Sequence, residues 1–94
     1  SEPVPQSPLH WSKKYHAVDL SEILCSFDLM SPRPIILSDG REAPFYLLIQ
    51  HFEQFLNVKL GNPGDIKRRV LERKKDRTKF TEVIFHTLND DENE

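Results

Sequence analysis

Positive charge is concentrated in one segment of this 94-residue chain. Residues 66 to 79 hold eight lysines and arginines against two acids, a formal charge of +6, although the whole chain carries −2. The eight cations are Lys67, Arg68, Arg69, Arg73, Lys74, Lys75, Arg77 and Lys79. Lysine and arginine contacts to phosphate supply most of the affinity of non-specific DNA binding. The segment is therefore our candidate DNA-binding site, and a solvated helix surface is the alternative.

The residues that could support catalysis or bind a metal lack the spacing that such chemistry needs. Cys25 is the only cysteine, and its neighbours Leu24 and Phe27 favour a small buried hydrophobe over a nucleophile. The four histidines do not have the paired spacing of a metal motif; they are His10, His16, His51 and His86. We predict no enzyme activity, no catalytic residues, no metal site, no cofactor and no small-molecule substrate.

The composition favours one small globular domain. Leu, Ile, Val and Phe fill 28 of the 94 positions, which is above the level of about one-fifth that is typical of disordered chains. One cysteine excludes an internal disulfide, and no apolar run approaches the roughly 18 residues of a membrane span. No signal-peptide pattern is present. We therefore expect a soluble, cytoplasmic protein with no membrane partner.

The spacing of apolar residues predicts four helices in order along the chain. The first is expected over residues 20–30, after a capping box formed by Asp19 and Glu22, and it ends at the prolines that follow. Residues 35–37 predict a short strand, and the next three predict a turn. The second helix is expected over residues 44–56, and the third over residues 65–76 with Asp65 as its N-cap.

The last segment, residues 78–89, fits a helix or a strand by periodicity alone. As a helix it would pack Phe80, Val83, Ile84 and Leu88 on the rest of the domain. The complete predicted core is Trp11, Leu20, Ile23, Leu24, Phe27, Leu48, Ile49, Phe52, Phe55, Leu56, Ile66, Val70, Phe80 and Ile84. We expect Trp11 to act as a lid over this core, because one tryptophan supplies a large apolar area in a small domain.

The second and third helices, with residues 57–64 between them, are arranged in the order of a helix-turn-helix motif. In that motif the second helix lies in the major groove while cationic side chains contact phosphates. The connection is longer than the usual three or four residues. A helix, a short strand and two further helices are also the first half of a winged helix.

Three segments of the chain are distinctive as motifs: Leu9-His10-Trp11, HFEQFLNVKLG over residues 51–61, and RKKDRTKF over residues 73–80. Together they resemble the RteC family, regulatory proteins of conjugative transposons in Bacteroidetes. The first is similar to the LHW that opens the family's C-terminal region, and the second to the end of a family helix and the connection after it. The third resembles the basic signature before the family's last helix. The resemblance implies a helical C-terminal domain of winged-helix type that binds DNA, and it favours the helical interpretation of residues 78–89.

From these observations we expect a mainly α fold, a four-helix, winged-helix-like (helix-turn-helix) domain with at most a small β element. Residues 1–8 are expected to form a flexible linker, residues 9–89 the RteC-like domain and residues 90–94 an acidic tail. The predicted function is a DNA-binding domain of a transcriptional regulator that controls excision and transfer genes. Duplex DNA is the expected partner, and homodimer formation or an upstream domain would tighten the binding. The alternative is a protein-interaction domain whose basic helix binds an acidic partner or another domain of a longer chain.

Overall fold

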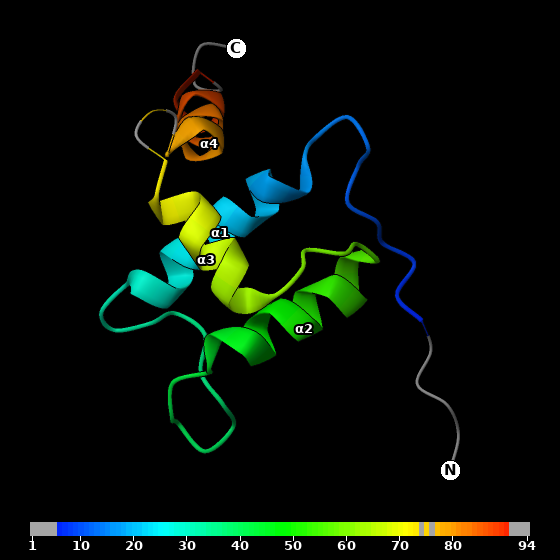
Figure 1. Ribbon diagram of the computed structural model, residues 1–94, viewed down its shortest axis with the longest axis vertical. Helices are drawn as coiled ribbons and strands as arrows, with labels where there is room; N and C mark the ends of the chain where they lie inside the picture. Colours follow the sequence, from blue (N-terminus) through cyan, green and yellow to red (C-terminus); the bar gives the residue numbers. More distant parts are fainter. Residues whose placement is uncertain (1–5, 74, 76, 91–94) are drawn as a thin grey trace.

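Four α-helices form the computed structural model of this protein, which describes residues 6–73, 75 and 77–90 (Figure 1). The helices are α1 (Ala17–Leu29), α2 (Phe45–Leu56), α3 (Pro63–Leu71) and α4 (Lys79–Asp90). The predicted mainly helical fold with four helices is therefore confirmed. Within the described part of the chain, the only β pairing is an isolated antiparallel bridge between Ile36 and Glu42. The short strand predicted over residues 35–37 is thus reduced to one bridge in a hairpin loop.

Helix α1 begins earlier than the sequence pattern predicts. His16 is the N-cap, and Asp19 lies in the first turn, where its Oδ2 accepts a hydrogen bond from the His16 backbone N–H at 3.0 Å. The prediction that Asp19 and Glu22 form the capping box was wrong, because Asp19 is the third helical residue and Glu22 is buried. The helix ends at Met30, before the prolines, as predicted.

Helix α3 also begins before its predicted N-cap. Asn62, not Asp65, is the cap: its Oδ1 accepts hydrogen bonds from the N–H groups of Gly64 at 2.9 Å and Asp65 at 3.3 Å. Pro63 follows in the first turn, where a missing N–H costs nothing. The helix ends at Leu71 instead of residue 76. Consequently, among the predicted DNA-binding cations, only Lys67, Arg68 and Arg69 lie on α3.

The core lies where α1, α2 and α3 meet. Its most deeply buried side chains are Leu24 and Cys25 of α1, Ile49 of α2 and Ile66 of α3. Predicted core residues Trp11, Phe27, Phe52 and Leu56 are partly buried and pack around this centre. Ala43 and Leu60, which helical spacing did not select because they lie in connections, are buried as well. Phe55 was placed in the core by its spacing, but it is exposed in the structure.

The segment before α1 is attached to the end of α2. The Trp11 backbone N–H donates to the Leu56 carbonyl at 2.8 Å, and its indole N–H donates to the His16 carbonyl at 3.0 Å. Asn57, in the left-handed conformation that ends α2, donates from its side-chain amide to the carbonyls of Ser7 and Leu9, both at 2.8 Å. The LHW stretch therefore has a structural role, and Trp11 packs against the core as expected.

Residues 79–90 form helix α4, so the helical interpretation is confirmed, but three of its four expected packing residues are exposed. Of the four, Phe80 packs on the body as predicted, through edge-on ring contacts with Trp11 at 5.8 Å and Tyr15 at 5.6 Å between centroids. Val83, Ile84 and Leu88 are exposed. Among the four helices α4 contacts only α1, and in Figure 1 it lies at one end of the molecule's long axis. None of these helices is long and apolar enough to cross a membrane.

Candidate nucleic-acid interface

Lys67 of α3 binds a buried carboxylate and is not available as a free surface cation. Its Nζ forms an ion pair with Asp28 of α1, whose side chain is 4% exposed, and lies 4.9 Å from the centroid of the Phe45 ring. Arg33 pairs with the same carboxylate at 3.5 Å and donates from Nε to the Asp28 carbonyl at 2.8 Å. Removing one partner of a buried ion pair leaves an uncompensated charge, so Lys67 serves the α1–α3 packing.

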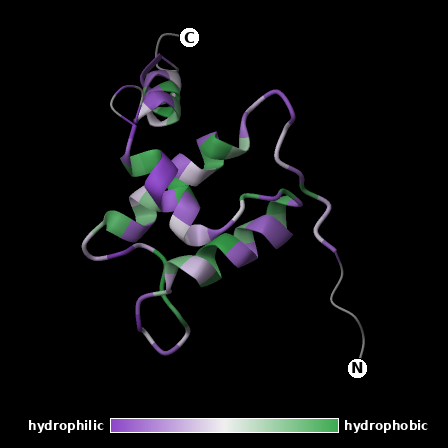
Figure 2. Cartoon of the chain, viewed as in Figure 1, coloured by the Kyte–Doolittle hydropathy of each residue, from purple (hydrophilic) through white to green (hydrophobic). Residues whose placement is uncertain are grey.

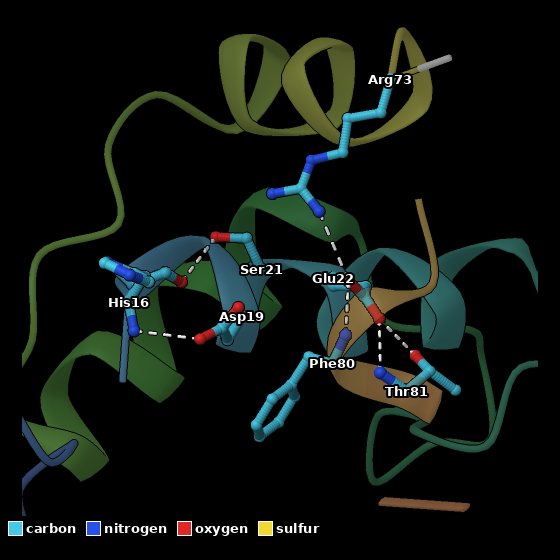
Figure 3. A network of polar contacts seen from close by, with 8 residues as sticks. His16, Asp19, Ser21, Glu22, Arg73, Phe80 and Thr81 are labelled. Carbon is cyan, nitrogen blue, oxygen red and sulfur yellow. Dashed lines mark hydrogen bonds and ion pairs between the residues drawn. The ribbon is translucent and has the colours of Figure 1, made fainter. Parts of the chain in front are cut away.

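Glu22 is the second buried carboxylate of α1, and it organises the start of α4 (Figure 3). Its Oε1 accepts from the Phe80 backbone N–H at 3.2 Å, and its Oε2 accepts from the Thr81 backbone N–H and hydroxyl, both at 2.6 Å. Arg73 pairs with Oε1 at 3.4 Å. Glu22 thus satisfies free N–H groups in the first turn of another helix, where a negative charge also interacts favourably with the helix dipole.

Arg68 lies on α3 opposite the buried residues Ile66 and Val70, whereas Arg69 lies at the edge of that buried side and lines a small pocket with residues of α1. Arg68 and Arg69 are both exposed. Arg68 pairs with Asp65 at 3.0 Å, in an exposed contact one turn apart on the same helix. Such surface pairs contribute about 0–1 kcal/mol, so the guanidinium of Arg68 can exchange this partner for a phosphate at little cost.

The remaining predicted cations follow α3 in the connection to α4. Arg77 donates a hydrogen bond to the Leu71 carbonyl and so caps the end of α3. Lys75 and Lys79 are exposed. Lys74 lies outside the described residues. The structure therefore divides the seven described residues of this set into two held by buried carboxylates, one that caps a helix, and four on the surface.

Cys25 does not have the surroundings of a reactive thiol. Burial raises the pKa of its thiol to about 11, against the opposing effect of the Lys67 charge, while the Asp28 charge raises it further. The thiol is therefore protonated at neutral pH. Among residues 6–73, 75 and 77–90, no group of three or more His, Cys, Asp or Glu side chains could hold a metal ion.

A groove of about 180 Å³ lies between the C-terminal ends of α1 and α3 and the start of α4. Its lining is largely apolar, and Arg77 contributes a cation to it. The lining residues are Glu22, Cys25, Ser26, Leu29, Val70, Leu71, Arg77, Thr78 and Thr81. A second open hollow, of about 310 Å³, lies between the hairpin loop and α2.

Sequence reasoning missed the two acids that organise this region. Asp28 and Glu22 lie within the apolar pattern of α1, and an acid in such a pattern is buried only when it is paired. The sequence therefore contained a signal for these two acids, because each lies next to apolar residues of the predicted first helix. Their partners could not be identified from the sequence, because Glu22 and Thr81 are distant in the chain.

Comparisons with known proteins found no matching family model, no similar curated protein and no similar solved structure.

Proposed function

We propose that this protein is a DNA-binding domain that contacts the phosphates of duplex DNA with the outer surface of α3 and the connection after it. The observation that supports this most directly is the separation of charge, +6 over residues 66–79 and −8 over the rest of the chain. Arg68 and Arg69 are exposed on α3 with the helix's apolar residues turned inward. Exposed arginines on a short helix can reach DNA phosphates without disturbing the core.

The proposed contact set is smaller than the eight cations that the sequence nominates. Lys67 and Arg73 are engaged by buried carboxylates, so their contribution to DNA affinity is indirect, through the position of α3. The direct contacts that we propose are Arg68, Arg69, Lys75 and Lys79. Four phosphate contacts correspond to a slope of about −3.6 in a plot of log affinity against log salt concentration.

Helices α2 and α3 are our candidate helix-turn-helix, with α3 as the recognition helix. Asn57 ends α2 in the left-handed conformation and Asn62 caps α3, so the connection between the helices is held at both ends. Glu53 adds to this by accepting hydrogen bonds from the backbone N–H groups of Leu60 at 2.7 Å and Gly61 at 3.4 Å. Together with the RteC resemblance, this supports the proposal of a regulator of conjugative-transposon excision and transfer genes.

The test is titration of the chain against mixed-sequence duplex DNA at several salt concentrations. The R68A/R69A double variant should reduce the magnitude of the salt slope by about two and weaken binding at low salt. Arg41→Ala is the matched control, because Arg41 is an exposed arginine that pairs with Asp39 in the hairpin loop. Absence of DNA binding by the folded chain, or an equal loss in both variants, would contradict the proposal.

A protein-interaction domain is the second candidate. It is favoured by the intramolecular contacts of Lys67, Arg68, Arg73 and Arg77, which reduce the free cationic surface. Competition separates the two candidates, because random duplex DNA displaces a bound nucleic acid but leaves a specific protein complex intact at moderate salt.

A further inference from the structure

Helix α4 has a broad apolar surface that the described residues of the chain do not cover. Phe85 is 62% exposed, Leu88 is 72% exposed and Val83 is 48% exposed. Ile84 and Leu88 lie one turn apart, and Phe85 lies beside them, so the three form a continuous surface on one side of the helix. The first turn is fixed to the body through Glu22 and Phe80, and the rest of the helix extends beyond it (Figure 1).

Helix α4 is amphipathic. Figure 2 shows hydrophobic residues alternating with hydrophilic ones along α4, at the end of the molecule that is remote from α2. A helix of 12 residues is about 18 Å long and straight, so it cannot fold back to cover its own apolar side. The groove between α1, α3 and α4 begins beside this surface, because Thr81 of the first turn of α4 forms part of its lining.

The groove and α4 have complementary chemistry. The groove has an apolar lining, with Leu29 and Leu71 among its residues, and Arg77 supplies a positive charge. Four residues of the basic segment line the groove, Val70, Leu71, Arg77 and Thr78, and residues 66–79 have a net charge of +6 in the sequence. The sequence from residue 80 to residue 94 has five acids and no lysine or arginine. An apolar helix in an acidic segment therefore follows directly after a basic segment that borders an apolar groove.

We propose that two copies of this chain form a two-fold dimer in which α4 of each copy packs across the groove of the other and places apolar side chains in it. Phe85 and Leu88 would contact the groove lining, and the acids of one α4 would face the basic segment of its partner. In this dimer the contact between α4 and the groove is made twice, once in each direction. Two-fold interfaces of this kind leave no copy of the contact surface free for a third chain. It covers both the exposed helix and the open groove, which no contact within one copy achieves. This inference does not depend on DNA binding.

The first test measures the mass of the complete chain by sedimentation equilibrium over a range of concentrations, without DNA. Wild type should show a concentration-dependent dimer. Phe85→Glu should lower the association constant by roughly 100-fold or more, as removal of an interface anchor does. Tyr46→Glu is the matched control, because Tyr46 is an aromatic residue of α2 that is 61% exposed, and it should dimerise like wild type. Circular dichroism checks that both variants remain folded.

Charge reversal then tests which surface receives α4. The E82K/D90K variant reverses the acids of α4, and K75E/R77E reverses two exposed cations of the basic segment, of which Arg77 lines the groove. Each variant should be monomeric alone. Mixing the two should restore a dimer, because each α4 then meets a groove of opposite charge. A dimer that survives K75E/R77E but not Phe85→Glu would show that the α4 helices pair with each other and would overturn the proposal. A wild-type chain that is monomeric at all concentrations would overturn it as well, and DNA binding by that monomer would leave the proposed function intact.

Discussion

Helices α3 and α4 are both short, amphipathic and packed on α1, but only α3 covers its apolar side. Ile66 and Val70 of α3 are buried between α1 and α2, and Lys67 fastens the helix to Asp28. Helix α4 is attached to α1 through its first turn, which donates hydrogen bonds to Glu22. Its later apolar residues are exposed to solvent. An amphipathic pattern therefore identifies the apolar side of a helix but does not identify what covers it.

The largest expected difference is between the core and α4, in the free energy of unfolding that is lost when a leucine is replaced by alanine. Leu24 is fully buried where α1 meets α2 and α3, so Leu24→Ala should lower the free energy of unfolding by about 2–5 kcal/mol. Leu88→Ala, on the exposed side of α4, should change it by less than about 0.5 kcal/mol. Urea denaturation at a concentration where the chain is monomeric measures both. Similar losses in the two variants would show that α4 buries Leu88 within one copy.

The second prediction concerns the attachment of α4. Glu22→Gln removes the charge that binds the first turn of α4 and the ion pair with Arg73 but keeps the size of the side chain. A hydrogen bond to a charged group contributes about 1.5–3 kcal/mol, so the free energy of unfolding should fall by about 1.5–3 kcal/mol. Amide hydrogen exchange in α4 should accelerate more than in α2. Glu82→Gln, at an exposed acid in the same first turn, is the control and should leave exchange in α2 and the global stability nearly unchanged.

The existence of the first three helices could be predicted from apolar residues at helical spacing, whereas residues 78–89 also fitted a strand by periodicity and were predicted as a helix from the family resemblance. The first residue of each helix was predicted less accurately, because several neighbouring polar residues could each serve as the N-cap. Asp65 and Asn62 are both good N-cap types, and Pro63 between them is the signal that favours Asn62. Asp19 was correctly associated with a capping box but placed at the wrong position in it.

The candidate site could be predicted as a charged segment but not as a surface. The eight cations were visible in the sequence, whereas the buried partners of Lys67 and Arg73 belong to α1, far away in the chain. Spacing also placed Phe55 and Ile84 in the core, because their helices are apolar over more of the circumference than the body can cover. Long-range pairing and the extent of coverage are properties of the folded chain, and one sequence does not contain them as a local pattern.

The third prediction tests which residue caps α3. Asn62→Ala removes the acceptor for two backbone N–H groups and should cost about 1 kcal/mol. Asn62→Asp keeps an acceptor and should restore most of that loss. Asp65→Ala, at the cap that the sequence pattern predicts, removes only an exposed pair with Arg68 and should cost about 0–1 kcal/mol. A larger loss for Asp65→Ala than for Asn62→Ala in thermal unfolding would reverse the assignment.

The last expected effect, which appears only above about pH 9, is the pH dependence that Cys25 adds to the α1–α3 region. Burial raises the pKa of this thiol from 9.0 to about 11, so the folded chain holds the proton more tightly than the unfolded chain. Its contribution to stability is therefore complete below about pH 9 and is lost as the pH rises from 9 toward 11. Comparing the pH profiles of unfolding for wild type and Cys25→Ala isolates this loss, because lysines and tyrosines titrate in both. The folded thiol should also react slowly with iodoacetamide at pH 8 and rapidly in denaturant. Fast modification of the folded chain would show that the α1–α3 contact opens. The apolar side of α3 would then also reach solvent, although less often than that of α4.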